Sequence, residues 1–213
     1  RHLSRAPDKE MQPTASRPLA FLLAPQAPGT GNAATAERIG HILEARGMRV
    51  LSVDPATLVA GEGADSEAAA AVDESGAVVV IALHGIKAAR LVIGCKAPMV
   101  LITGGTDVNV DIVEDSQKAA TMARVLRWEG TAAVVSFSGA MIAAMHGLLK
   151  ATADTVPTCA GERWRTGAPP VHLIPQGVEL PPRPPIGSGL ETLVQRIVGT
   201  VLRDGEALSA ARE

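Results

Sequence analysis

Short, largely apolar runs alternate along the chain with longer stretches in which apolar residues recur at helical spacing. The runs predict strands, most of them buried on both faces of a sheet. They lie at 19–24, 48–53, 77–83, 98–103, 132–137 and 171–175. The periodic stretches predict helices at 32–46, 66–72, 115–128 and 138–149. This alternation indicates an α/β protein with a Rossmann-like, doubly wound, mostly parallel sheet and right-handed crossovers.

Three residues mark the expected helix ends. Asn32 is expected to cap the first helix and Gly47 to end it in a left-handed conformation. Ser138 is expected to cap the helix that follows the fifth strand.

The chain divides into three predicted parts. Residues 1–17 are polar and predict a disordered leader, and 18–180 hold the Rossmann-like domain. Residues 181–213 begin with a proline-rich stretch, which predicts a stiff linker, and continue into a terminal helix. The apolar stripe of that helix, over 190–202, could dock a second domain or chain.

Composition narrows the function classes. The 213 residues are 46% hydrophobic, 20% charged and 2% aromatic, with a net charge of -2. Such a chain can bury a sizeable core, and it lacks the basic field and stacking rings that nucleic-acid binding needs. Cys95 and Cys159 are too few and too far apart for a metal site or a disulfide framework, so no metal and a reducing cytoplasm are expected. Polar residues interrupt the longest nearly uncharged segment, 131–149, and no membrane span is expected.

A glycine turn precedes the first predicted helix. Gly29, Thr30, Gly31 and Asn32 follow the first strand, where two glycines let backbone approach an anion and the helix amides favour negative charge. A phosphate or diphosphate is the expected guest. The alternative is that both glycines merely turn the chain.

The same turn also fits a dinucleotide fingerprint. The residues from Gly29 to Ala34 match G-x-G-x-x-A, and Asp54 follows where a ribose-binding carboxylate would stand. An NAD-binding oxidoreductase is therefore an alternative. Residues 25–28 argue against it, because the fingerprint requires a tight turn directly after the strand.

Two further strand ends carry polar residues. His84 follows the third strand, and the fourth runs into a polar segment that ends at Asp111. Its glycines permit an unusual backbone path, and its hydroxyl, carboxylate and amide groups suit sugar hydroxyls. The candidate residues of this segment are Gly104, Gly105, Thr106, Asp107, Asn109 and Asp111. The alternatives are a satisfied buried histidine and a loop in which Asp107 caps a local turn.

Four stretches together resemble the N-terminal half of a GT-B glycosyltransferase. They are GNAATAERI (31–39), ALH (82–84), GGTDVNVD (104–111) and IPQGV (174–178). The resemblance covers about residues 18 to 180. It is to family 4 enzymes of the glycosyltransferase 1 domain-containing type and, more distantly, to selenosugar synthases.

The resemblance implies transfer of a sugar from a nucleotide-sugar donor, with retention of configuration and without a metal ion or other cofactor. In such enzymes the N-terminal domain mostly receives a small-molecule or glycan acceptor. The turn at 29–32 would face the donor diphosphate, and His84 and Asp107 would act in catalysis beside the 104–109 segment. Gln176 and Gly177 would line the crossover into the second domain.

The donor-binding half of such an enzyme is missing from this sequence. Enzymes of this type hold the nucleotide with a glutamate pair spaced E-x7-E, and no two glutamates here have that spacing. The chain is therefore expected to be a truncated part of a two-domain enzyme, and whether it is itself an enzyme stays open. The alternative is a non-catalytic binding or assembly module built on a degenerate GT-B half.

Overall fold

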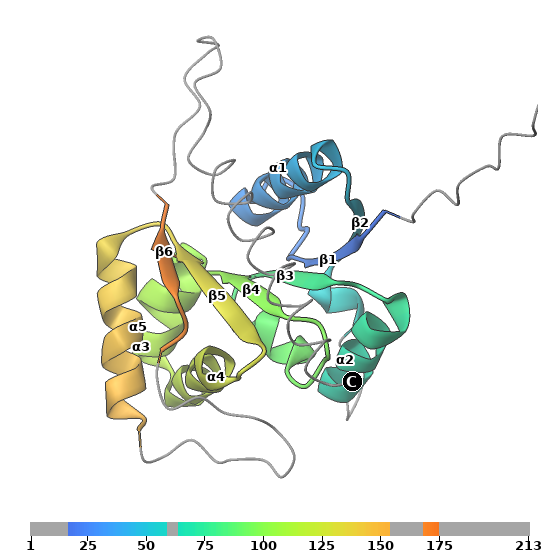
Figure 1. Cartoon of the computed structure of the whole chain (residues 1–213). Helices are drawn as coiled ribbons and strands as arrows, with labels where there is room; N and C mark the ends of the chain where they lie inside the picture. The colour runs from blue at the N-terminus through green and yellow to red at the C-terminus, as the bar shows by residue number, and fades with distance from the viewer. Residues whose placement is uncertain (1–16, 59–63, 154–167, 175–213) are drawn as a thin grey trace, which may run out of the picture.

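A computed structural model of the chain describes residues 17–58, 64–153 and 168–174. These residues form a six-stranded sheet in the order β2-β1-β3-β4-β5-β6, and every neighbouring pair is parallel. The strands are β1 (Leu19–Leu23), β2 (Arg49–Val53), β3 (Val79–Leu83), β4 (Met99–Ile102), β5 (Thr131–Ser136) and β6 (Val171–Leu173). All their carboxyl ends therefore lie at one edge of the sheet (Figure 1).

Five α-helices connect the strands in the described part of the chain. They are α1 (Gly31–Ala45), α2 (Ala64–Ser75), α3 (Ile112–Glu114), α4 (Ser116–Arg127) and α5 (Gly139–Ala151). Of these, α1 covers one face of the sheet, and α2, α4 and α5 pack on the other (Figure 1). The strand order reverses at β1, which creates a switch point between β1 and β3. The Rossmann-like α/β fold predicted from the sequence is confirmed.

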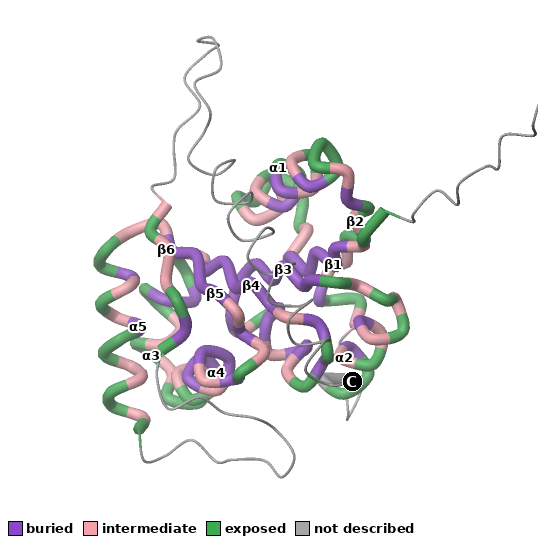
Figure 2. The backbone as a smooth tube through the Cα atoms, in the orientation of Figure 1, coloured by how far each residue is buried: buried purple, intermediate pink, exposed green. Residues whose placement is uncertain are grey.

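Each face of the sheet has its own apolar core. On the α1 face, Leu22 of β1 packs with Ile39 and Leu43 of α1. On the opposite face, Leu23 and Phe21 belong to the core that includes residues of α2, α4 and α5. The central strands are buried on both sides (Figure 2), which explains their continuous apolar runs.

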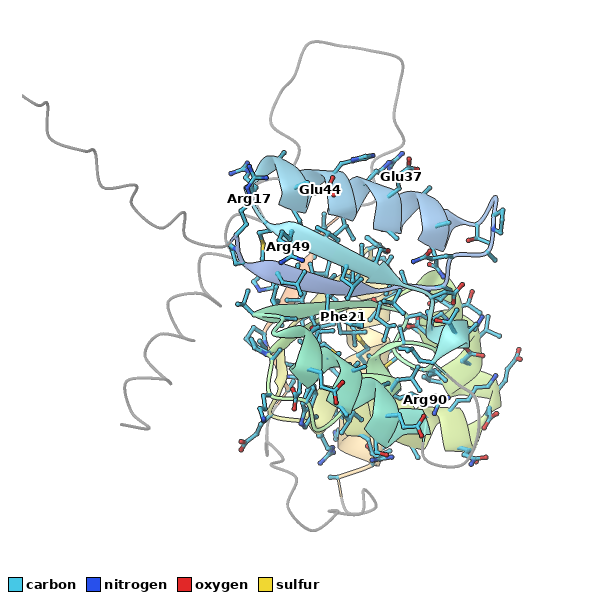
Figure 3. All side chains as sticks on the ribbon, turned by 90° about the vertical axis from the view of Figure 1, so that its right-hand side faces the viewer. Arg17, Phe21, Glu37, Glu44, Arg49 and Arg90 are labelled. Carbon is cyan, nitrogen blue, oxygen red and sulfur yellow. The ribbon has the colours of Figure 1, made fainter. Side chains whose placement is uncertain are left out.

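Charged side chains lie around this layered core. Figure 3 shows the arginines and glutamates that it labels at the periphery and Phe21 between the layers. The part of the chain described by the structure contains no helix with the length and apolar content needed to cross a membrane.

The helix ends confirm two of the three predicted caps. Ser138 caps α5 by accepting the Met141 N–H at 3.2 Å, and Gly47 follows α1 with φ 82°. The prediction for Asn32 is wrong, because Gly31 is already helical and Thr30 is the N-cap. Threonine and asparagine cap by the same chemistry, so residue type did not distinguish them.

Short irregular elements complete the described part. Two 3-10 helices, η1 (Pro55–Thr57) and η2 (Ala89–Val92), follow β2 and β3. A π-helical turn, η3 (Asp107–Asp111), follows β4 and leads into α3 and α4. The leader up to residue 16, Gln176, Gly177 and the predicted linker and helix at 181–213 lie outside the described residues.

Candidate functional site

Three of the sequence-predicted segments lie at the carboxyl edge of adjacent strands. The turn at 29–32 follows β1, His84 follows β3, and the segment at 104–109 follows β4. The strand β3 pairs with β1 on one side and β4 on the other. The turn leads into α1 on one face, whereas η3 packs against the core of the opposite face.

His84 has an unusual backbone conformation. Its φ is 81°, and among the residues that the structure describes it is the only non-glycine residue with a positive φ. Such a conformation is strained for a side-chain-bearing residue and persists only where surrounding contacts hold it. Here the His84 N–H donates to the Ile102 carbonyl at 2.9 Å, and the His84 carbonyl accepts the Ala88 N–H at 3.0 Å. These bonds hold the backbone of His84, and with it the attached imidazole, at the end of β3.

The carboxylate of Asp107 is buried next to the backbone of Gly85. The residue has 0% exposure, and its Oδ2 accepts the Gly85 N–H at 2.7 Å. Burial raises the pKa of Asp107 to about 7, against the lowering effect of the amide bonds from Gly85 and other backbone groups. Oδ1 has no hydrogen-bond partner in the structure. Asp107 therefore joins η3 to the residue that follows His84.

The imidazole of His84 is also buried, with 2% exposure. Its Nδ1 accepts the Lys87 N–H at 3.3 Å, and its Nε2 has no hydrogen-bond partner in the structure. Burial, followed by the charge of Lys87, lowers the pKa of His84 to about 4. The ring is therefore neutral at pH 7, and because Nδ1 acts as an acceptor, the ring proton lies on Nε2.

An ion pair lies next to that nitrogen. Asp111 Oδ2 is 3.8 Å from His84 Nε2, and Asp111 Oδ1 is 2.7 Å from Lys118 Nζ. The hydrogen bond to Asp111 raises the pKa of Lys118. The sequence analysis missed Lys118, because it lies on α4 and nothing local links it to η3. The sequence holds one clue to where Lys118 lies. Asp115 marks the start of α4, and its side chain caps that helix and accepts the Lys118 N–H at 3.1 Å.

The glycines near His84 differ in the space around them. A Cβ on Gly85 would overlap the Met122 side chain, and one on Gly104 would lie 3.3 Å from Asp107 Oδ1. Gly104 thus allows close packing over the buried carboxylate. The other candidates of the segment face outward and are exposed, namely Gly105, Thr106 and Asn109.

The glycine turn has the features of an anion cradle. Gly29 has φ 76°, Thr30 caps α1, and a Cβ on Gly31 would have nothing within 4 Å. The first turn of α1 contains no acidic residue, so its positive end is not offset by a nearby carboxylate. Gly29, Thr30 and Gly31 are exposed and Asn32 is half-buried.

Asp54, the residue of the NAD alternative, is engaged by backbone amides. Its Oδ2 accepts the Gln26 N–H at 3.1 Å, and its Oδ1 accepts the Ala56 N–H at 2.9 Å. It therefore caps η1 and ties the loop after β1 to β2.

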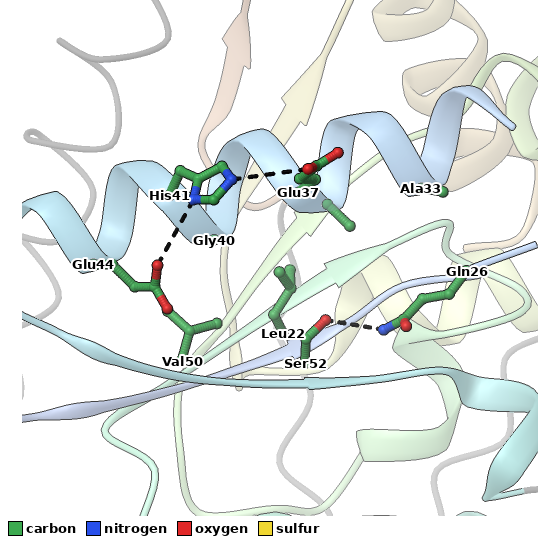
Figure 4. A pocket seen from close by; sticks show the side chains of 10 residues that line it. Leu22, Gln26, Ala33, Glu37, Gly40, His41, Glu44, Val50 and Ser52 are labelled. Carbon is green, nitrogen blue, oxygen red and sulfur yellow. Dashed lines mark hydrogen bonds and ion pairs between the residues drawn. The ribbon is translucent and has the colours of Figure 1, made fainter. Parts of the chain in front are cut away.

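A cavity of about 330 Å³ opens between α1 and the β1–β2 end of the sheet (Figure 4). His41 lies 3.9 Å from Glu37 and 3.8 Å from Glu44, and Gln26 donates to Ser52 at 2.9 Å. The cavity is lined by residues next to the glycine turn, but by none of the predicted site residues themselves. Over the described ranges, no group of three His, Cys, Asp or Glu side chains is placed to hold a metal ion.

Comparison with known proteins shows a similarity to a glycosyltransferase-domain protein. No protein-family model matches the sequence. The chain is 31% identical over 149 residues to glycosyltransferase 1 domain-containing protein 1 of Xenopus tropicalis. The match covers 70% of this chain and 36% of the relative, so the chain spans about a third of the relative's length. The resemblance predicted from the motifs is confirmed, and the parallel sheet is consistent with one half of a GT-B fold.

Proposed function

We propose that this chain, a homologue of a glycosyltransferase 1 domain-containing protein, forms the acceptor-side half of a sugar-transfer site. The reaction moves a sugar from a nucleotide-sugar donor to a small-molecule or glycan acceptor, with retention and without a metal ion. The convergence of the 29–32 turn, His84 and the 104–109 segment at the carboxyl ends of adjacent strands carries this proposal. Ligands of open α/β sheets bind at that edge, at a switch point such as the one between β1 and β3.

The glycine turn suits the donor diphosphate. The amides at the start of α1 carry partial positive charge, and the absence of a side chain at Gly31 leaves room for a phosphate oxygen. Positive φ at Gly29 aims the chain into the helix without strain. A second domain would supply the remaining contacts to the nucleotide.

His84 acts in this proposal as a neutral hydrogen-bond donor. Its pKa of about 4 keeps the ring uncharged at pH 7, and its buried Nε2–H has no hydrogen-bond partner within the protein. Such a donor stabilises an oxygen of the reacting sugar or acceptor without adding a charge. Asp107 Oδ2 accepts the Gly85 N–H at 2.7 Å, so Asp107 holds Gly85 and thereby the backbone of His84, which makes it a positioning residue.

A transfer assay tests the proposal. The chain is expressed together with its flanking coding sequence and supplied with radiolabelled UDP-, GDP- and ADP-sugars and a mixture of sugar and polyol acceptors. We expect one donor to yield a glycoside, with a rate that EDTA does not change. In the variant His84→Asn, asparagine tolerates positive φ and preserves the turn, and we expect the rate to fall at least about tenfold.

Two results would overturn the proposal. One is the absence of both binding and turnover for every donor. The other is calorimetric binding of NAD in the absence of binding of uridine or guanosine diphosphate, which would restore the oxidoreductase alternative.

A further inference from the structure

The strand β2 has one open edge in the described sheet, because β1 is the described strand that pairs with it. On the inner edge, the Arg49 N–H donates to the Pro18 carbonyl at 2.8 Å. Alternate residues of a parallel strand direct their backbone groups to the same neighbour, so Val50 and Ser52 direct theirs to the outer edge. Each of these two residues therefore presents one N–H and one carbonyl to a further strand.

The cavity beside α1 adjoins this open edge (Figure 4). Val50 and Ser52 line it from β2, together with the buried Leu22 of β1 and several residues of α1. Side chains of neighbouring strands lie next to each other on the same face of a sheet. Half of the side chains of an added strand would therefore point to the α1 face and reach the cavity, where Leu22 and Val50 offer an apolar surface.

Carboxylates lie along the α1 side of the cavity. Glu37 and Glu44 both line it, and His41 lies between them at 3.9 Å and 3.8 Å. Both distances are too long for a hydrogen bond, so the two carboxylates can still accept hydrogen bonds from another donor. Among the described residues that line the cavity, none is lysine or arginine. The α1 face of the open edge therefore favours a cationic side chain.

The opposite face of β2 has a different character. Arg49 and Leu51 point to that face, because Val50 and Ser52 point to the cavity. The Leu51 side chain is 42% exposed. An apolar side chain on an added strand would cover Leu51, whereas a basic one would be repelled by Arg49. The two faces of the open edge thus favour two different kinds of side chain.

We propose that β2 binds an extended segment of a partner protein in which basic residues alternate with apolar ones. The segment pairs with the backbone of Val50 and Ser52 and continues the sheet by one strand. Its basic side chains point to α1, with their aliphatic stems against the cavity and their charges near Glu37 and Glu44. Its apolar side chains cover Leu51. This surface lies apart from the proposed sugar-transfer site, so the inference does not rest on the proposed function.

A second copy of this chain fits the open edge less well. Two copies related by a two-fold axis perpendicular to the sheet would pair their β2 strands in antiparallel fashion. Both α1 helices would then lie on the same face, and Glu37 and Glu44 of one copy would face the same residues of the other. Like charges brought together in this way oppose the association.

A peptide titration tests the proposal. A seven-residue peptide of alternating lysine and valine is added to the ¹⁵N-labelled protein. We expect the backbone amides of Val50 and Ser52 to shift and to become protected from hydrogen exchange, because each N–H gains an acceptor. We expect two control peptides to bind at least about tenfold more weakly. One has glutamate in place of lysine, and the other has the same lysines and valines grouped in two blocks.

Backbone methylation of the peptide tests main-chain pairing separately from charge. Two further peptides carry N-methyl groups on either the lysines or the valines. In an added strand, the N–H groups of one set point to β2 and those of the other set point away. We expect methylation of one set to weaken binding at least about tenfold and methylation of the other to change it by less than about threefold.

Variants of the protein test the acidic side of the cavity. In the double variant Glu37→Gln and Glu44→Gln we expect the Kd of the lysine–valine peptide to rise about threefold to tenfold, the effect of losing two exposed ion pairs. Glu67→Gln is the matched control, because it removes an exposed carboxylate of α2 on the other face of the sheet. It should stay within about twofold of the parent protein. Circular dichroism on each variant verifies folding.

The inference fails if the lysine–valine peptide binds no more tightly than its two controls, or if the amides of Val50 and Ser52 stay unmoved. It also fails if light scattering shows a dimer in which these amides are protected without peptide, because a second copy then occupies the edge. Neither result affects the proposed function. A protein that transfers no sugar and still binds the peptide at β2 keeps this inference and loses the proposed function.

Discussion

The Gly85 amide donates to Asp107 Oδ2 at 2.7 Å, although 22 residues of chain separate the two. This bond joins the backbone after β3 to the π-helical turn after β4. It therefore connects the two segments that hold the polar residues of the candidate site, and the backbone of His84 depends on it.

Truncating this carboxylate should destabilise the fold. In Asp107→Ala the Gly85 N–H loses its acceptor inside the protein, so we expect the free energy of unfolding at pH 4, where the raised pKa of Asp107 costs little, to fall by about 1–3 kcal/mol. Asp107→Asn retains a carbonyl oxygen for the same bond and should cost less. Urea denaturation monitored by circular dichroism measures both values. Asn109→Ala, an exposed change in the same turn, should stay within about 0.5 kcal/mol of the parent, and an equal loss there would contradict the role of the bond.

The pKa values of Asp107 and His84 predict opposing effects of pH on stability. Folding raises the pKa of Asp107 from 3.8 to about 7. Between these two pH values the folded state holds a proton that the unfolded state has released, so the free energy of unfolding falls as pH rises. The pKa of His84 falls from 6.5 to about 4, so the unfolded state binds the extra proton and stability rises with pH. The two effects oppose each other between about pH 4 and 6.5.

Single substitutions should separate these two effects. Asp107→Asn removes the effect of Asp107, so only the effect of His84 remains. The free energy of unfolding of this variant should therefore rise more steeply between pH 4 and 6.5 than that of the parent protein. His84→Asn should do the opposite, with stability falling up to about pH 7. Urea unfolding of the three proteins at half-unit pH steps gives the slopes. Parallel curves for all three would show that neither group titrates abnormally.

The two glycines of the turn should respond differently to alanine. Gly29 has φ 76°, so Gly29→Ala should lower the free energy of unfolding by about 1–2 kcal/mol. Gly31 has ordinary helical geometry and open space, so Gly31→Ala should change stability by less than about 0.5 kcal/mol. The added methyl group would nevertheless occupy the place proposed for the diphosphate. Calorimetric titration with the active donor should therefore show weaker binding, and unchanged affinity would remove the turn from the site.

Much of the architecture could be predicted because its causes are local in the sequence. Buried parallel strands require continuous apolar runs such as 98–103, and Ser138 and Gly47 mark helix ends by their own chemistry. The same local logic placed His84 and Asp107 at one edge of the sheet. Their types and positions at strand ends were sufficient for that placement.

The finer geometry of the site depends on contacts between distant residues. No local pattern predicts that Asp107 is buried and bonded to Gly85, or that η3 is π-helical. Lys118 escaped notice for the same reason, since its bond to Asp111 forms only when η3 and α4 pack together. Gln176 and Gly177 lie outside the described residues, so their role and the division at 180 stay predictions, as does a cytoplasmic location.

The most direct test of the account is an amide NMR titration of the ¹⁵N-labelled protein with the nucleotide sugar that it turns over. The account predicts that the amides of 29–32, 84–85 and 104–111 shift together with one Kd, because these segments surround one ligand. Shifts confined to the cavity beside α1, around Gln26 and Ser52, or to a single segment, would contradict a shared sugar-transfer site.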